Sequence, residues 1–171
     1  MKILFLDIDG VLNSDEWYAR RRQKLGDLSH LDPALVARAG EVASRSGASV
    51  VISSAWRMHR DLEELRAVLG AAGLRAPILG ETPVLSDGEP DGLNRAAEIL
   101  RWLERHTHEA FTGRTEPVRA FAILDDLPDF GPLAPWHVAT DPAVGLQPAD
   151  AAHAMELLGV FAELRHTAAR Y

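Results

Sequence analysis

Carboxylates and a hydroxyl follow three separate apolar runs of the sequence. Asp7 and Asp9 follow the first run, Ser53 follows the second, and Asp125 and Asp126 follow a later one. Carboxylates gathered in one cleft repel each other unless a cation lies among them, and an all-oxygen ligand set suits Mg²⁺. The spacing of Asp7 and Asp9 also favours different environments and different roles for the two acids. The alternative is ordinary turn chemistry, which becomes less convincing when the pattern recurs after three strands.

The elements that must position these groups alternate between strands and helices. Apolar runs predict the strands, and amphipathic stretches with capping residues predict the helices. We therefore expect an α/β fold of the Rossmann-like, doubly wound type, with a mostly parallel sheet of about five strands, helices on both faces and a site at the carboxyl ends of the strands. The expected strands are Lys2–Leu6, Ser49–Ile52, Pro77–Leu79, Ala120–Leu124 and Trp136–Thr140, and the expected helices are Pro33 to near Gly47, Leu62 to Gly70 or Gly73, Leu93–Leu103 and Pro148 to about Thr167.

Composition narrows the class of protein. The chain has 171 residues, of which 47% are hydrophobic and 25% are charged, and this balance predicts one globular domain over residues 1–171. The absence of cysteine excludes disulfides, thiolate zinc sites, iron–sulfur clusters and a cysteine nucleophile. The formal net charge of -7 argues against a protein that binds nucleic-acid phosphates over its whole surface. Apolar stretches are too short for a membrane span or a signal peptide, so we expect a cytoplasmic protein without membrane partners.

The order of the motifs resembles that of the haloacid dehalogenase-like (HAD) phosphohydrolases. Asp7-Ile8-Asp9-Gly10-Val11-Leu12-Asn13 is similar to the first motif of that family, Val51-Ile52-Ser53 to the second, and the run from Ile123 to Asp129 to the fourth. Three more segments resemble a small HAD group found alone or in RNA-repair proteins: Ser53–Arg57, Arg95–Leu103, and Thr140-Asp141-Pro142 with Gly145-Leu146. The resemblance covers nearly the whole chain.

This resemblance implies a Mg²⁺-dependent phosphatase that hydrolyses a phosphomonoester through an aspartyl-phosphate. Asp7 would be the nucleophile and Asp9 the acid and base of the two half-reactions. A carboxylic acid two residues after the nucleophile separates the phosphatases of the family from its dehalogenases and transport ATPases. Mg²⁺ would be held by the Asp7 carboxylate, the Asp9 carbonyl and Asp125, with waters positioned by Asp126 or by Asp129.

The resemblance also implies groups that bind the phosphate. Ser53, with Ser54 beside it, would donate to a phosphoryl oxygen. The third motif of the family usually carries a lysine, but no lysine follows Lys24, so an arginine must substitute. Arg95 is the best candidate, at the start of the helix before the fourth strand, and the alternative for it is a solvated helix-face arginine. Arg57 fits two interpretations equally, a phosphate or substrate contact and an arginine packed at the edge of the core.

The segment after the first motif bears on the substrate. About twenty residues separate Asn13 from Asp32, too few for a cap domain, so we expect an open cleft. The basic and aromatic run Trp17–Lys24 lies there and fits either a nucleic-acid contact or a solvated helical turn. The expected substrate is a phosphorylated small molecule or a nucleotide or nucleic-acid end, with a polynucleotide end phosphatase and a non-catalytic interaction domain as alternatives. An open cleft also leaves room for a second copy of the chain, which would make a homo-oligomer.

Overall fold

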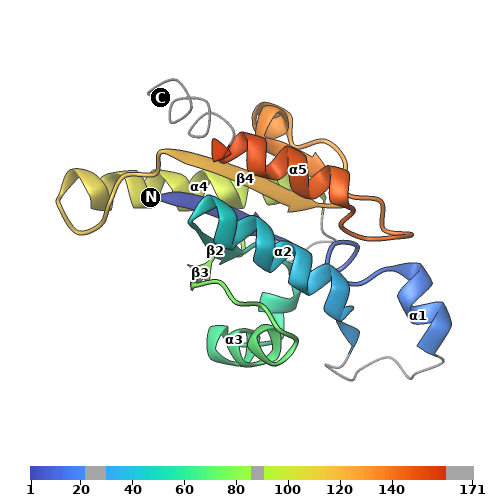
Figure 1. Ribbon diagram of the computed structural model, residues 1–171. Coiled ribbons are helices and arrows are strands. Elements are labelled where there is room, and N and C mark those ends of the chain that lie inside the picture. The colour runs from blue at the N-terminus through green and yellow to red at the C-terminus, as the bar shows by residue number, and fades with distance from the viewer. Residues whose placement is uncertain (22–29, 86–90, 161–171) are drawn as a thin grey trace, which may run out of the picture.

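The computed structural model describes residues 1–21, 30–85 and 91–160, with a five-stranded sheet at its centre (Figure 1). All neighbouring strands are parallel, in the order β3-β2-β1-β4-β5. The chain crosses from one side of β1 to the other between β3 and β4, so the predicted doubly wound arrangement is confirmed. The strands are β1 (Lys2–Leu6), β2 (Ala48–Ile52), β3 (Ile78–Glu81), β4 (Ala120–Asp125) and β5 (His137–Ala139).

Helices cover both faces of the sheet because successive side chains of a strand point to opposite faces. Leu4 and Leu6 pack in one core, together with α2 (Pro33–Ser46), α3 (Leu62–Ala71) and α5 (Pro148–Leu157). Ile3 and Phe5 pack in a second core on the other face, against α4 (Gly92–Phe111). The short 3-10 helix η2 (Ala55–Met58) follows β2, and a second one, η3 (Gly131–Trp136), precedes β5.

The helix α2 begins and ends where the sequence predicts. The side chain of Asp32 accepts a hydrogen bond from the backbone N–H of Ala34 at 2.8 Å, and Pro33 fits the first helical position because its missing N–H has no partner to lose. Gly47 ends the helix in the left-handed conformation, with φ of 67°, which favours glycine. The helix then leads the chain into β2, and Ser53 follows the carboxyl end of that strand.

The strand β3 differs from its expected range of Pro77–Leu79. It begins one residue later, because proline has no N–H for the ladder, although the carbonyl of Pro77 still accepts from the N–H of Val50 at 2.8 Å. It also continues to Glu81, two residues beyond the expected end at Leu79. The longer strand brings Thr82 to the same edge of the sheet as Ser53, since the N–H of Thr82 donates to the carbonyl of Ile52 at 2.9 Å.

The helix α4 is longer than its expected range of Leu93–Leu103, and it ends at Phe111. The rings of Trp102 and His106 stack with their centroids 4.7 Å apart, and this pair extends the buried face of the helix beyond Leu103. The expected end at Leu103 is therefore wrong, because this packing continues the helix beyond it.

The segment between β1 and α2 contains the short helix α1 (Asp15–Arg21) in its described part, and no cap domain is evident there. The basic run Trp17–Lys24 begins in α1, and its residues 22–24 lie outside the described residues. Likewise, α5 is described to Leu157, and residues 161–167 of the expected last helix fall outside the description. No helix within the described ranges is long and apolar enough to cross a membrane.

Candidate active site

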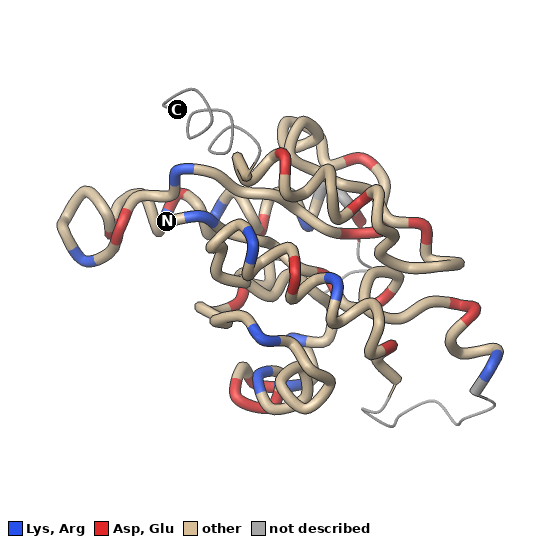
Figure 2. The backbone as a smooth tube through the Cα atoms, in the orientation of Figure 1, with Lys and Arg blue, Asp and Glu red and all other residues tan. Residues whose placement is uncertain are grey.

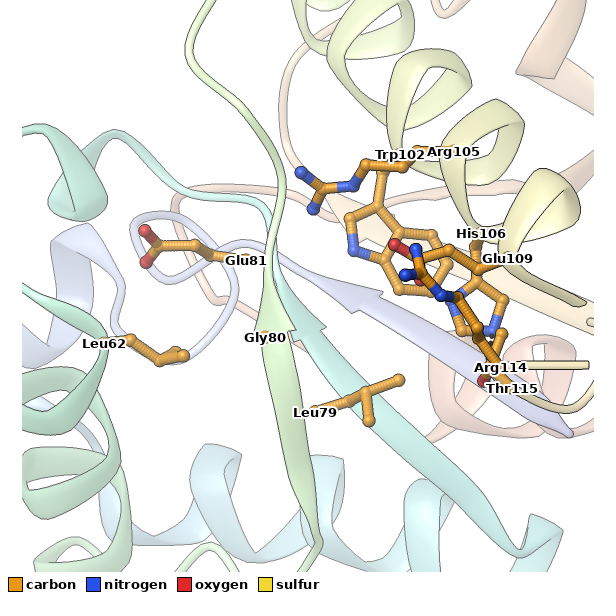
Figure 3. A pocket seen from close by; sticks show the side chains of 10 residues that line it. All are labelled: Leu62, Leu79, Gly80, Glu81, Trp102, Arg105, His106, Glu109, Arg114 and Thr115. Atoms are coloured by element: carbon orange, nitrogen blue, oxygen red, sulfur yellow. Dashed lines mark hydrogen bonds between the residues drawn. The ribbon is translucent and has the colours of Figure 1, made fainter. Parts of the chain in front are cut away.

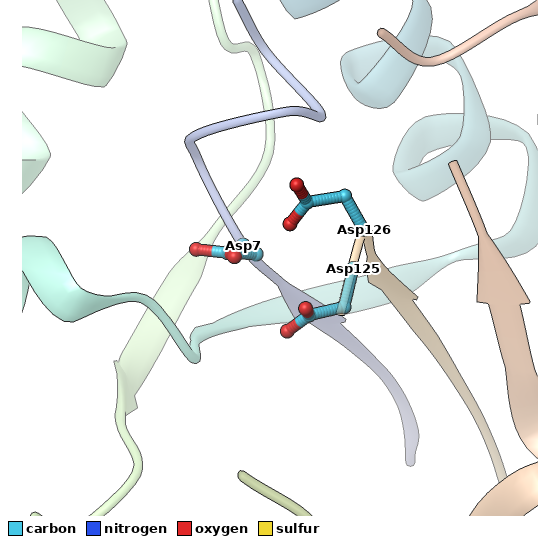
Figure 4. Close-up of side chains that lie close together, drawn as sticks. All are labelled: Asp7, Asp125 and Asp126. Carbon is cyan, nitrogen blue, oxygen red and sulfur yellow. The ribbon is translucent and has the colours of Figure 1, made fainter. Parts of the chain in front are cut away.

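Three carboxylates meet at the carboxyl ends of β1 and β4. Asp7 follows β1, Asp125 ends β4, and Asp126 comes next. The N–H of Asp7 donates to the carbonyl of Leu124 at 3.0 Å, so pairing of the two neighbouring strands continues to the acids themselves. One oxygen from each carboxylate lies within 4.8 Å of the other two (Figure 4). Acidic positions predominate around this edge (Figure 2), in a chain whose formal net charge is -7.

Burial dominates the electrostatics of this carboxylate cluster. Asp7 and Asp125 are buried, and Asp126 is half-buried. Burial raises the pKa of Asp7 to about 6, against the opposing effects of Arg95 and of a hydrogen bond from the Ser54 side chain. Burial, followed by the negative charge of Asp7, raises the pKa of Asp125 well above its usual range, and burial also raises the pKa of Asp126. The three acids therefore need more positive charge close by to ionise together.

Arg95 brings a positive charge to the cluster from the start of α4. Asp91 caps this helix by accepting from the N–H of Asn94 at 2.7 Å. The side chain of Arg95 is buried, with Nη1 lying 3.5 Å from Oδ1 of Asp7 and 3.6 Å from Oδ2 of Asp125. Within the described residues, neither Nη1 nor Oδ2 of Asp125 has a hydrogen-bond partner. One donor and one acceptor are therefore buried side by side in the site without a hydrogen-bond partner.

The donor set of the cluster fits a hard divalent cation, because it is all oxygen and includes the unpartnered Oδ2 of Asp125. Gly10 leaves room for Asp126. Its φ is 67°, and a Cβ there would lie 2.4 Å from Oδ2 of Asp126. Asp129, the alternative to Asp126, is outside the group of carboxylates close enough to share an ion, and its side chain accepts from the N–H of Gly131 at 3.1 Å.

The two serines after β2 lie beside the buried acids. Ser53 is buried, and its N–H donates to the carbonyl of Leu6 at 2.9 Å, which aligns it with the end of β1. Ser54 caps η2 by accepting from the N–H of Trp56 at 3.3 Å, and its side chain also hydrogen-bonds Asp7. Thr82 lies behind Ser53, with their hydroxyl oxygens 3.5 Å apart. No local pattern in the sequence pointed to Thr82, because its position depends on the extension of β3.

The guanidinium of Arg57 is buried in a hydrogen-bond network next to Arg95. It donates through Nε to the carbonyl of Thr82 at 3.1 Å and through Nη1 to the carbonyl of Ser54. Its Nη2 pairs with Oε2 of Glu98, which is itself buried. Sequence analysis missed Glu98, although its place three residues after Arg95 on the same helix puts the two on one face. The Nε of Arg95 lies 3.9 Å from the same Glu98 oxygen.

Asp9 lies apart from the buried cluster and is exposed. Both of its oxygens accept hydrogen bonds, one from Nδ2 of Asn13 at 2.7 Å and one from Nε1 of Trp56 at 2.8 Å. Asn13 also closes its own loop by accepting from the N–H of Gly10 at 2.9 Å. Asn13 therefore both stabilises its own loop and orients Asp9. The contact with Trp56 spans 47 positions, so the sequence carried no local signal for it.

A cavity with a volume of about 480 Å³ lies between β3 and the later part of α4 (Figure 3). Its walls include Leu79 and Glu81 from β3, Trp102 and Arg105 from α4, and Arg114 from the loop after the helix. The predicted site residues do not line this cavity. They lie instead along the carboxyl edge of the sheet, from Ser53 through the acids.

The fold and the cluster together define an α/β protein of the Rossmann type with a candidate cation site at the carboxyl edge of its parallel sheet. The chain belongs to the family described as the HAD domain in Swiss Army Knife RNA repair proteins, whose sequence profile matches residues 3–151. The resemblance inferred from the motifs is therefore confirmed. No curated protein and no solved structure matches the chain.

Proposed function

We propose that the protein is a Mg²⁺-dependent phosphatase that hydrolyses a phosphomonoester through an aspartyl-phosphate. The observation that carries this proposal is the environment of Asp7, whose buried carboxylate lies 3.5 Å from an unpartnered guanidinium nitrogen of Arg95. A buried carboxylate facing such a donor suits attack on a phosphorus atom whose oxygens the donor can bind. Family membership supports the same class of chemistry.

The reaction has two half-reactions, divided between Asp7 and Asp9. A carboxylate oxygen of Asp7 attacks phosphorus, the bond from phosphorus to the leaving oxygen breaks, and the carboxylic acid of Asp9 gives its proton to that oxygen. Asp9, now ionised, takes a proton from a water molecule as the water attacks the phosphorus of the aspartyl-phosphate. Inorganic phosphate leaves, and the carboxylate of Asp7 and the acid of Asp9 are restored. The different exposure of the two acids supports this division, because only Asp9 reaches solvent.

The cation would be held by the carboxylates of Asp7, Asp125 and Asp126, with the carbonyl of Asp9 as a further ligand implied by the family pattern. When bound, Mg²⁺ neutralises charge on the phosphoryl oxygens and on the acids. Burial raises the pKa of Asp7 and that of Asp125, so a positive charge close to them would favour their ionised forms.

The transferred phosphoryl group would also be bound by Arg95 and by the serines after β2. The unpartnered Nη1 of Arg95 supports its assignment to the third motif. Ser53 and Ser54 lie at the end of the strand next to β1, so their donors can approach the same group as Asp7. For Arg57 we propose a supporting role, because its guanidinium already donates to carbonyl oxygens and to Glu98.

A nucleic-acid end is the more specific substrate candidate. The family is described from RNA-repair proteins, and the described residues between β1 and α2 include no cap over the site. A site of this kind has room for a substrate that extends away from the phosphate. The alternatives are a small phosphorylated metabolite and a domain of the same fold that has no catalytic role.

Phosphate release from a panel of substrates tests the proposal. The panel should contain sugar phosphates, nucleotides, an aryl phosphate, and oligonucleotides phosphorylated at the 3′ or the 5′ end, each with Mg²⁺ and with EDTA. We expect release that requires Mg²⁺. If a folded preparation releases no phosphate from any member, the protein is a non-catalytic domain and the proposal is wrong.

A further inference from the structure

Two aromatic side chains flank the exposed acid Asp9. On one side, the indole N–H of Trp56 donates to Oδ2 of Asp9 at 2.8 Å. On the other side, Asn13 donates from the same amide nitrogen to Oδ1 of Asp9 and to the hydroxyl of Tyr18, both at 2.7 Å. The chain of contacts from Trp56 to Tyr18 therefore runs through the carboxylate of Asp9, which we propose as the acid that protonates the leaving oxygen.

Both aromatic side chains are partly exposed. Tyr18 is 36% exposed, and Trp56 is half-buried because part of its side chain packs against the core. The guanidinium carbon of Arg60 lies over the indole, 4.6 Å from its ring centroid, so a planar cation covers part of that ring. In contrast, the nucleophile Asp7 is buried. A substrate bound with phosphorus at Asp7 and its leaving oxygen at Asp9 would place the rest of its structure towards these rings.

Of the eight large apolar side chains exposed among the described residues, four lie in segments that follow the carboxyl ends of strands. Tyr18 comes from α1 after β1, Met58 from η2 after β2, and Val84 and Leu85 follow β3. Leu85 is tied to the wall of the site, since its N–H donates to Oε1 of Glu98 at 3.2 Å. Exposed apolar side chains at the edge of the sheet that holds the site favour a ligand with planar or apolar parts over a compact polyhydroxylated one.

We propose that Trp56, Arg60 and Tyr18 form a subsite that stacks the base of the terminal nucleotide of a substrate, next to the acid that protonates its leaving oxygen. This inference rests on the proposed function for the position of the leaving oxygen, and it names the substrate class as a nucleotide end. Aromatic faces bind bases of any sequence, and a neighbouring arginine favours both the base and the next phosphate. The bound end is recognised by its base, and the remaining strand extends into solvent.

A binding measurement tests the subsite without relying on turnover. The protein carries Asp7→Asn so that a phosphorylated ligand stays intact, and Mg²⁺ is present. The ligands are a dinucleotide with a terminal phosphate, at the 3′ or the 5′ end, and an abasic dinucleotide with the same phosphates. We expect the ligand with bases to bind about tenfold more tightly, which is the order of effect of one base–aromatic stack. Equal affinity for the two ligands overturns the proposal.

Substitutions at Trp56 separate stacking from orientation of Asp9. Trp56→Phe keeps an aromatic ring but removes the N–H, so preference for the ligand with bases should remain. Trp56→Leu removes the ring and should reduce that preference to within about twofold. Trp136→Leu is the matched control, because Trp136 is 38% exposed in η3 and has no contact with Asp9 among the hydrogen bonds of the described residues. A preference that survives Trp56→Leu would mean that Trp56 only orients Asp9.

A substitution at Tyr18 is the second test if Trp56→Leu fails to fold, because the Tyr18 side chain is exposed. Tyr18→Ala on the surface of α1 should lower the preference for bases several-fold, and an unchanged preference would contradict the subsite. Failure of the proposed function gives a different result. A protein that prefers the ligand with bases yet releases no phosphate keeps the subsite and loses the phosphatase. A protein that releases phosphate without any preference for bases keeps the phosphatase and loses the subsite.

Discussion

Two buried arginines, Arg57 and Arg95, lie on the same wall of the site and differ in how their hydrogen bonds are used. Arg57 donates to the backbone carbonyls of Ser54 and Thr82 and pairs with Glu98. Arg95 has an unpartnered Nη1, close to two acids but beyond hydrogen-bond distance. Burial alone does not distinguish them. A guanidinium whose donors are used by backbone carbonyls and a buried acid supports the fold, whereas a buried guanidinium with a donor that makes no hydrogen bond can bind a ligand.

Glu98 connects the two arginines and explains their division of labour. Its Oε2 pairs with Nη2 of Arg57 and lies 3.9 Å from Nε of Arg95. Because the contact with Arg57 is the shorter one, Glu98 balances the positive charge of Arg57 more than that of Arg95. The guanidinium of Arg95 is therefore balanced mainly by Asp7 and Asp125, the acids at which we place the phosphoryl group and the cation.

The largest effect should come from the acid that Arg95 faces. Asp7→Asn preserves the size of the side chain but removes the charge and the nucleophile, so phosphate release should fall to background while the fold stays intact. Phosphate release and thermal unfolding, measured on the same preparation, check both parts. Substantial release by a folded Asp7→Asn protein would exclude Asp7 as the nucleophile.

In contrast to changes at Asp7, Arg57→Ala should chiefly lower the free energy of unfolding. It leaves the buried carboxylate of Glu98 without its close partner, and breaking a buried pair in this way costs about 3–5 kcal/mol. The free energy of unfolding, measured in urea, should fall by that amount. The control is Arg101→Ala, since the side chain of Arg101 is 63% exposed and the change should be small. Equal stability of the two variants would show that the network around Arg57 does not support the fold.

Arg95→Ala should act chiefly on turnover. Loss of one preorganised donor to developing charge typically costs about 3 kcal/mol, or about 10²-fold in rate. Arg95→Lys should recover part of the rate if charge matters more than the forked geometry of the guanidinium. Steady-state kinetics check this against Arg101→Ala on the same helix. If Arg95→Ala loses no more activity than Arg101→Ala, our assignment of the third motif is wrong and Arg57 becomes the leading candidate.

Ionisation of Asp7, which faces Arg95, should also affect how the free energy of unfolding depends on pH. Burial raises the pKa of Asp7 from 3.8 to about 6, so folding favours its protonated form. The contribution of protonated Asp7 to the free energy of unfolding is complete below pH 3.8 and is lost as the pH rises through 6. One pKa unit corresponds to about 1.4 kcal/mol. In EDTA, wild-type protein should therefore lose up to about 3 kcal/mol relative to Asp7→Asn between about pH 4 and pH 7. Parallel curves for the two proteins, from urea unfolding, would contradict the raised pKa.

The sheet was predictable because each strand is a short apolar run bounded by polar or turn residues, and the alternation with helices left few topologies. Element ends were less predictable where long-range contacts decide them. β3 extends to Glu81 because Thr82 continues its pairing with Ile52, and α4 extends past Leu103 because the Trp102 and His106 rings stack. Neither contact leaves a local pattern in the sequence.

The acids of the site were predictable because they follow strands directly, and parallel strands bring their carboxyl ends together. The choice of Asp126 over Asp129 in the carboxylate group needed the structure, because it depends on the turn at Gly10. The pairing of Arg57 with Glu98 spans 41 positions, and the hydrogen bond from Trp56 to Asp9 joins η2 to the loop after β1. Such partners depend on tertiary packing, which the sequence pattern does not encode locally.

Phosphorylation of Asp7 during turnover can be tested directly by measuring the mass of the protein. Asp9→Asn with an aryl phosphate suits this test, because an aryl oxide leaves with little acid assistance, whereas attack by water still needs the missing base. We predict that one phosphoryl group accumulates on the peptide containing Asp7, and that Asp7→Asn combined with Asp9→Asn abolishes the adduct. Phosphate release from the aryl ester with no adduct on Asp7, or an adduct on a different residue, would contradict the account.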